Sequence, residues 1–126
     1  MTSVETDKGL GFHKSQRLLN ASDYSAVFDA AQVKVSHPAF LILARTNSLG
    51  HARLGLVIAK KNVRLATRRN QIKRLIRESF RLKQHNLPAI DAIVLARRDS
   101  EKATKEDIHR CLNKLWKRVV ERANKT

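Results

Sequence analysis

The chain has little of several residue types. It contains one cysteine, Cys111, in 126 residues, which excludes an internal disulfide, a zinc ribbon and other Cys-rich metal sites. Only four glycines are present, so a glycine-rich loop for nucleotide phosphates is not expected. The longest apolar runs, residues 39–44 and 54–59, are far too short to span a membrane. The N-terminus carries Glu5 and Asp7 and does not resemble a signal peptide. A cytoplasmic protein with no membrane partner is expected.

Acidic residues are also scarce. Eleven Asp and Glu stand against 26 Lys and Arg, and the formal charge is +15. Such a charge is typical of proteins that bind nucleic acid and is poorly suited to a stand-alone metabolic enzyme. The hydrophobic fraction of 42% indicates a folded chain, and this length fits one domain. We expect a single domain over residues 1–126, with a flexible segment at 1–11 and the folded part at 12–122.

The few carboxylates and histidines form no catalytic constellation. Metal-dependent phosphodiester cleavage needs clustered carboxylates, but Asp91 stands alone at a strand start. Four acidic residues near a helix start are better interpreted as capping and charge compensation. We therefore predict no catalytic residue and no metal ligand in the protein, which should not hydrolyse RNA on its own. The acidic group is Asp99, Glu101, Glu106 and Asp107, and the scattered histidines are His13, His37, His51, His85 and His109.

Apolar periodicity and turn residues predict the order helix, two or three strands, helix, strand, helix. Asn20 or Ser22 can cap the first helix, and Thr104 with Asp107 resembles a capping box that opens the last one, to about residue 122. The long strands 40–45 and 53–59 are predicted to pair as an antiparallel hairpin. A short strand at 33–35, a basic helix at about 67–84 and a strand at 91–97 complete the pattern. One sheet with helices against it is the economical architecture, an α/β (α+β) fold.

The most informative segment is residues 60–81, in which nine residues are cationic and one is acidic. On a helix the cations stack at one-turn spacing, where like charges repel unless a polyanion screens them. Arginine forks suit phosphate oxygens, so nucleic-acid binding is favoured over a solvated face, without a choice between DNA and RNA. The apolar face comprises Ile72, Leu75, Ile76 and Phe80, and the opposite face comprises Asn70, Lys73, Arg74, Arg77 and Arg81.

Aromatic residues are few. Tyr24 and Phe28 lie one helical turn apart, and Phe40 opens the next strand. Their spacing leaves two interpretations open, which are packing in the core and a surface on which unpaired bases stack. Cys111 lies near the apolar stripe of the last helix and is expected to be buried.

The segment 60–78 resembles the signature of the bacterial ribonuclease P protein component. That signature has a Lys-Lys pair after a strand, then an Ala, then Arg-Asn-Arg, an aliphatic residue, Lys-Arg and Leu-Ile-Arg. The chain departs from it at Gln71, where a second Arg is usual, and Leu43 stands where some members carry an aromatic residue. The matching residues are Lys60-Lys61, Ala66, Arg69-Asn70-Gln71, Ile72, Lys73-Arg74 and Leu75-Ile76-Arg77, and the resemblance extends to residues 17–19, 23–28, 53–57 and 93–97.

The resemblance implies a two-layer sandwich like the second domain of ribosomal protein S5. Its element order would be α-β-β-(β)-α-β-α, with a left-handed βαβ crossover through the basic helix, against the usual right-handed rule. The chain would be a subunit of an endoribonuclease that removes the 5′ leader of precursor tRNA. Catalysis would belong to the RNA subunit and its Mg²⁺ ions, and the protein would hold the leader in a cleft between the sheet and the first helix.

The resemblance also implies two sets of binding residues. A non-catalytic ribosomal or ribosome-assembly protein remains the alternative, and a DNA-binding module is disfavoured because no helix-turn-helix pair precedes the basic helix. Contacts to the catalytic RNA would come from Lys60, Lys61, Arg64, Arg68, Arg69, Asn70, Lys73, Arg74 and Arg77. Contacts to the leader would come from Lys14, Arg17, Tyr24, Phe28, Phe40 and Arg45.

Overall fold

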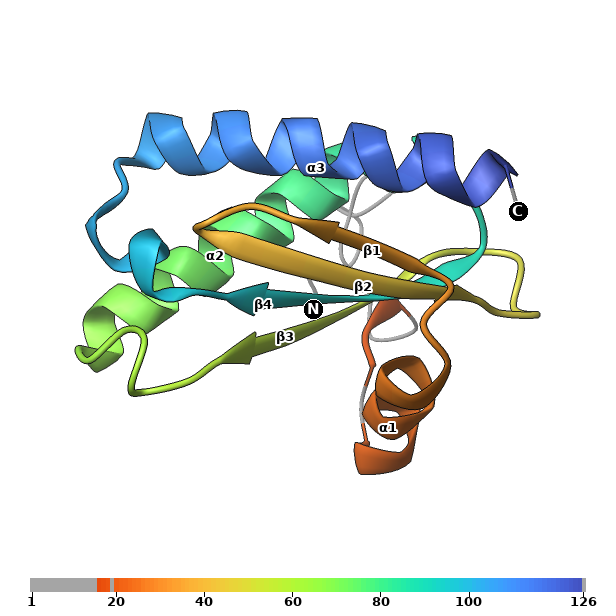
Figure 1. Cartoon of the computed structure of the whole chain (residues 1–126), viewed down its shortest axis with the longest axis horizontal. Helices are drawn as coiled ribbons and strands as arrows, with labels where there is room; N and C mark the ends of the chain where they lie inside the picture. Colours follow the sequence, from red (N-terminus) through yellow and green to blue (C-terminus); the bar gives the residue numbers. More distant parts are fainter. Residues whose placement is uncertain (1–15, 19, 126) are drawn as a thin grey trace, which may run out of the picture.

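The computed structural model describes residues 16–18 and 20–125, which form three α-helices, four strands and two short 3₁₀ turns (Figure 1). The predicted flexible segment 1–11 and Lys14 lie outside the described residues. The elements in chain order are α1 (Ala21–Ala30), β1 (Val33–Ser36), β2 (Phe40–Thr46), β3 (Arg53–Ile58), α2 (Ala66–Lys83), η3 (Gln84–Asn86), β4 (Ile90–Ala96), η4 (Arg98–Lys102) and α3 (Lys105–Lys125).

Both predicted helix starts are confirmed. The side chain of Asn20 caps α1, since its Oδ1 accepts a hydrogen bond from the Asp23 N–H at 3.0 Å. At the start of α3, the Asp107 N–H donates to Thr104 Oγ1 at 3.0 Å, and the Thr104 N–H donates to Asp107 Oδ2 at 3.3 Å. This reciprocal pair is the capping box expected from the sequence. Helix α3 ends three residues later than predicted.

The predicted hairpin of β2 and β3 is wrong. The sheet order is β1-β2-β4-β3, so β4 lies between the two strands and pairs antiparallel with β2 and parallel with β3. The physical reason is burial. Six of the seven residues of β4 are buried, which requires cover on both faces and a neighbour on each side. A hairpin would have left this strand at an edge.

Strands β3 and β4 are joined through α2 as the strand–helix–strand unit that the resemblance implies. In Figure 1 both strands point to the left, β4 lies above β3, and α2 passes behind the sheet. This path from β3 to β4 turns in the left-handed sense, which is rare for such a connection. The crossover brings α2 beside β3 at the edge of the sheet.

Helices α2 and α3 cover one face of the sheet and form the larger core with it. They are locked to each other by Trp116, whose indole N–H donates to Ser79 Oγ at 3.0 Å, and whose ring centroid lies 5.9 Å from that of Phe80. Helix α1 lies against the opposite face, where Val27 packs with Leu18 and Ile93 in a smaller cluster (Figure 1). The polar side of α2 is therefore exposed to solvent.

Candidate nucleic-acid interface

Helix α2 presents its cationic face to solvent as predicted. Its apolar residues are packed into the larger core, with Ile72, Ile76 and Phe80 fully buried. The helix is therefore fixed in rotation, and its charges project from the fold without a hydrophobic partner. Among the predicted RNA-contacting residues, the exposed ones are Lys60, Lys61, Arg64, Asn70, Arg74 and Arg77, and the half-buried ones are Arg68, Arg69 and Lys73.

Arg68 is engaged within the fold. Its Nε donates to the Glu101 carbonyl oxygen at 3.0 Å, and its Nη2 donates to the carbonyl oxygens of Ser100, at 3.2 Å, and Ala103. Its Nη1 donates to Gln71 Oε1 at 3.2 Å. These bonds tie the first turn of α2 to η4. Gln71, the departure from the family pattern, thus supports Arg68 from one turn along the helix.

Arg69 holds the loop that precedes α2. Its Nη1 donates to the carbonyl oxygens of Val63, at 3.0 Å, and Arg64, at 2.9 Å. The Arg64 N–H in turn donates to Glu101 Oε2 at 3.0 Å. The loop is fixed by these bonds, so the exposed Lys60, Lys61 and Arg64 side chains start from a defined backbone. Arg68 and Arg69 therefore position the cationic surface.

Tyr24 covers the exposed edge of the sheet. The Leu56 N–H of β3 donates to the Tyr24 hydroxyl oxygen at 3.1 Å, and the Leu18 N–H donates to the Leu54 carbonyl oxygen at 3.0 Å. Gly55 permits this approach, because a Cβ there would lie 2.9 Å from Tyr24 ring carbons and from Leu18 Cδ1. A glycine inside a strand often marks such a close approach, so this signal was available in the sequence.

A small cavity lies where Tyr24 and α2 meet. Its volume is about 190 Å³. Apolar and aromatic residues and three cationic side chains line it together, an arrangement suited to a phosphate beside a base or sugar. The cavity is lined by Arg17, Leu18, Tyr24, Leu54, Leu56, Lys73 and Arg77. The structure thus brings together two residues of the predicted leader set, Arg17 and Tyr24, with two of the predicted RNA set, Lys73 and Arg77.

The other predicted leader residues have different fates. Phe28 is 45% exposed on α1, which favours the stacking surface over core packing. Phe40 is wrong as a leader residue, since it is fully buried between the sheet and the two long helices, on the face opposite α1. Half-buried Arg45 donates from Nη1 to the Ala26 carbonyl oxygen at 3.3 Å and so braces α1.

An ion-pair network holds the start of α1 against the sheet. Arg53 binds the Asp91 carboxylate with two hydrogen bonds of 2.8 and 2.7 Å, and Asn47 Nδ2 donates to the same carboxylate at 2.8 Å. Arg53 Nη1 also lies 3.6 Å from Asp23 Oδ2. Burial acts to raise the pKa of Asp91, but the hydrogen bonds from Arg53 and Asn47 outweigh it and lower that pKa. The hydrogen bond to Asp91 raises the pKa of Arg53.

The acidic residues have structural roles where the structure shows their contacts. Asp91 pairs with Arg53, Asp107 caps α3, and Glu101 accepts from the Arg64 N–H. Within residues 16–18 and 20–125, no three His, Cys, Asp or Glu side chains gather as a metal site would require. Cys111 is buried as predicted, and burial raises the pKa of its thiol to about 11. No helix in the described part of the chain is long and apolar enough to cross a membrane.

Comparisons with known proteins agree with this architecture. A sequence model of the ribonuclease P family matches residues 12–120. The ribonuclease P protein component of Saccharophagus degradans is 51% identical over 99% of this chain and 93% of its own length. That of Marinobacter nauticus is 54% identical over 89% and 84%. The solved structure of the Staphylococcus aureus RNase P protein has a TM-score of 0.77 and 30% identity, covering 82% of this chain and 94% of that one.

The fold and its cationic helix define a small α/β nucleic-acid-binding protein. The particular class follows from the matches, which span most of the chain and share one description: the chain belongs to the ribonuclease P protein family. It is accordingly the protein subunit of a ribonucleoprotein endoribonuclease of tRNA processing. The alternative of a ribosomal or ribosome-assembly protein finds no support in these relatives.

Proposed function

We propose that the chain binds the catalytic RNA of ribonuclease P through α2 and its preceding loop, and the 5′ leader of precursor tRNA through Arg17, Tyr24 and Phe28. The cavity shared by Tyr24, Lys73 and Arg77 is the observation that supports this most. It makes one continuous surface of the α1 side and the α2 side, so a leader on one would pass close to RNA on the other. Lys14 belongs to the same proposed leader set.

In this proposal the protein binds and positions the leader of precursor tRNA, and the RNA subunit performs the hydrolysis. The Mg²⁺ ions would be held by the RNA subunit and the substrate, since the carboxylates with visible contacts serve the fold. The reaction would take place in the cytoplasm. Purified protein with Mg²⁺ should leave precursor tRNA intact, and adding a ribonuclease P RNA transcript should restore 5′ cleavage at low salt. Cleavage by nuclease-free protein alone would contradict this division of labour.

Phe28→Ala is the sharpest test of leader binding. Phe28 is nearly half exposed, so its removal should cost little stability. Tyr24→Ala is a poorer probe, because the Tyr24 hydroxyl accepts a hydrogen bond from β3 and its loss would also disturb the fold. Loss of stacking should weaken binding of precursor tRNA to the holoenzyme by about 1–3 kcal/mol and leave mature tRNA, which lacks the leader, unaffected.

The control for Phe28→Ala is Leu82→Ala, because Leu82 is a similarly exposed apolar residue on α2. Affinities of the holoenzyme for precursor and mature tRNA should be compared, with a thermal melt of each variant. An equal loss for both ligands, or the same loss in the control, would remove Phe28 from the leader site.

Arg77→Ala tests the RNA surface of α2. Arg77 is exposed and makes no hydrogen bond or ion pair with residues 16–18 or 20–125. Its loss should weaken binding to the catalytic RNA and reduce the slope of log affinity against log salt by about one unit. Lys125→Ala removes a charge from the far end of α3 and is the control. If Arg77→Ala binds with the slope of the wild-type protein, the face is only solvated. Arg69→Ala is less informative, because Arg69 also holds the loop.

A further inference from the structure

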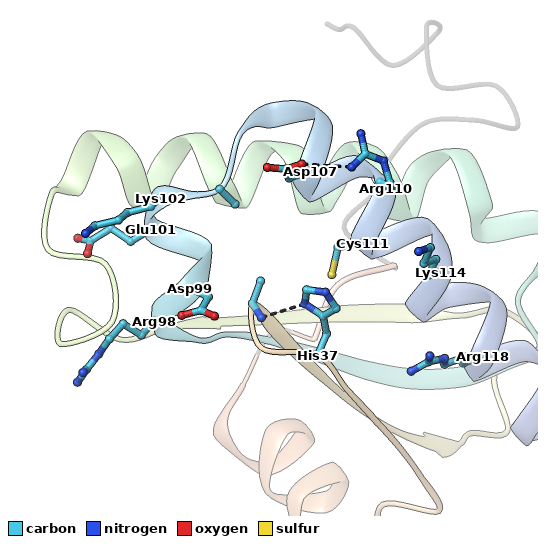
Figure 2. Close-up of a pocket in the computed structure, with 12 residues that line it drawn as sticks. His37, Arg98, Asp99, Glu101, Lys102, Asp107, Arg110, Cys111, Lys114 and Arg118 are labelled. Carbon is cyan, nitrogen blue, oxygen red and sulfur yellow. Dashed lines mark hydrogen bonds and ion pairs between the residues drawn. The ribbon is translucent and has the colours of Figure 1, made fainter.

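A second cationic groove lies along the N-terminal half of α3. It is bounded by the β1–β2 turn, by η4 and by α3, and its volume is about 760 Å³ (Figure 2). None of the predicted RNA or leader residues that the structure describes lines it. Figure 2 shows His37 and Cys111 at its centre, with Lys114 and Arg118 following along the helix. The charged lining comprises Arg98, Lys102, Arg110, Lys114 and Arg118, with Asp99, Glu101 and Asp107.

The α3 wall of this groove repeats the charge pattern of α2. Arg110, Lys114 and Arg118 line it at four-residue spacing, so each lies one turn from the next. Arg122, one turn further along, lies outside the groove and donates from Nη1 to the Lys34 carbonyl oxygen. Like charges at this spacing destabilise a helix by a few tenths of a kcal/mol for each pair. An anion bound between them would reverse the sign of that interaction.

The groove has five cationic side chains and three carboxylates, which leaves it with a net positive charge. Asp107 caps α3 and pairs with Arg110 at 3.2 Å, and Glu101 accepts from the Arg64 N–H. Lys114 and Arg118 make no hydrogen bond or ion pair within residues 16–18 and 20–125. Two cations one turn apart thus stand in a hollow with their donors available.

The lining also indicates which kind of anion fits. His37 Nδ1 accepts a hydrogen bond from the Ala39 N–H at 3.0 Å, so in the neutral ring Nε2 carries the proton and is a donor. Among the residues that the structure describes, no Phe, Tyr or Trp lines the groove, so these residues offer no platform for unpaired bases. Donors without stacking surfaces suit the phosphates of a folded, double-helical segment.

The position of the groove separates it from the first site. The β1–β2 turn and the Tyr24 cavity lie toward opposite edges of the sheet, since β1 and β3 are its two edge strands. The groove nevertheless adjoins the start of α2. Arg68 of α2 donates hydrogen bonds to carbonyl groups of η4, and η4 forms one end of the groove. An RNA docked on the start of α2 would therefore have this groove beside it.

We propose that the α3 groove binds the phosphate backbone of a second, double-helical segment of the catalytic RNA. The inference rests on the proposed function in one respect, that the partner is this RNA. Contacts there would add affinity and fix the orientation of the protein, and they would carry no base specificity.

The test compares two double variants of the full-length chain that each remove two charges from α3. Lys114→Ala with Arg118→Ala removes two cations from the groove wall. Lys117→Ala with Lys125→Ala removes two exposed cations outside the groove. Binding to a ribonuclease P RNA transcript is measured over a salt series, with a thermal melt of each variant. The groove variant should lose up to about two units of the log–log salt slope, at roughly 0.7–0.9 per phosphate contact, and the control should lose much less.

A second measurement locates the RNA. In a Cys111→Ser background, an iron chelate that generates hydroxyl radicals is attached at Asp99→Cys, in the groove, or at Asn113→Cys, outside it. The groove probe should cut the transcript in a double-helical segment that the other probe does not cut. If the groove variant matches the control and both probes cut alike, the inference fails. The proposed function is tested separately by Arg77→Ala, whose effect on affinity does not depend on the groove.

Discussion

Gly55 is the position at which a single methyl group should disturb the site. A Cβ added there would lie 2.9 Å from Tyr24 Cε2 and Cζ and from Leu18 Cδ1. The Leu18 methyl group is the end of a flexible side chain and can rotate away. The Tyr24 ring is rigid, and its hydroxyl oxygen is held at 3.1 Å by the Leu56 N–H. Gly55→Ala should therefore push the ring outward and break this hydrogen bond.

The magnitude follows from opposing terms. Overpacking costs about 1–3 kcal/mol. Loss of the hydrogen bond adds about 0.5–1.5 kcal/mol. Replacing glycine restricts the unfolded chain and returns about 0.4–1 kcal/mol. We expect a net loss of about 0.5–4 kcal/mol in the free energy of unfolding, with a central value of about 2 kcal/mol. Binding of precursor tRNA should also weaken, because the displaced Tyr24 ring no longer lines the cavity in the same position.

A double-mutant cycle with Tyr24→Ala makes this reasoning testable. Denaturant unfolding would be measured for the wild-type protein, Gly55→Ala, Tyr24→Ala and the double variant. If the added methyl group acts through the ring, Gly55→Ala should cost less when the ring is absent, with a coupling of at least about 0.5 kcal/mol. Tyr24→Phe separates the hydrogen bond from the overpacking. A Gly55→Ala protein as stable as the wild type, or additive costs in the cycle, would refute the argument.

Three further predictions concern stability and reactivity. Arg68→Ala should lower the free energy of unfolding by about 1–3 kcal/mol, because carbonyl groups of η4 lose their donor. Arg74→Ala, on the exposed face of α2, should leave that free energy unchanged. Equal denaturation midpoints for the two variants would contradict the role given to Arg68. The pKa of Asp91 is lowered in the folded state, so its contribution to stability is present above the unfolded pKa of about 3.9 and is lost as pH falls through the folded value. Acid unfolding curves should therefore show Asp91→Asn less stable than wild type at neutral pH, with the difference shrinking below about pH 4; a constant difference would argue against the ion pair. Cys111, with a pKa of about 11, should react with a thiol reagent at pH 8 far more slowly in the folded protein than in denaturant, and equal rates would mean that the thiol is not buried.

The sequence was sufficient where the signal is local. Asn20 and the pair Thr104 and Asp107 cap helices as their spacing predicts, because capping involves residues three apart in the chain. The apolar stripe of α2 likewise predicts which of its cations are exposed, since the 3.6-residue period of the helix places the two sets on opposite faces. The four-residue column of cations on α3 was equally visible in the sequence. The apolar stripe of the same helix explains its fold without this column, so the spacing alone does not indicate a function for it.

The sequence was insufficient where the outcome depends on distant partners. Phe28 and Phe40 look alike in the chain, but one lies at the surface of α1 and the other beneath α3, because burial depends on which face of the sheet each meets. Arg68 and Arg69 read as free cations in a basic run. Their carbonyl partners at residues 63–64 and 100–103 are supplied by loop geometry that spacing does not reveal.

Strand order is the feature that joins the two halves of the site. With β4 inserted between β2 and β3, β3 becomes an edge strand, and its free backbone groups are taken up by Leu18 and Tyr24. The same insertion requires α2 to cross back from the end of β3 to the start of β4. Lys73 and Arg77, one turn apart on α2, therefore lie beside the edge that Tyr24 covers. A β2–β3 hairpin would have separated these residues. The parallel crossover thus gives a physical reason why the two proposed binding surfaces, for the leader and for the catalytic RNA, lie side by side on one small chain.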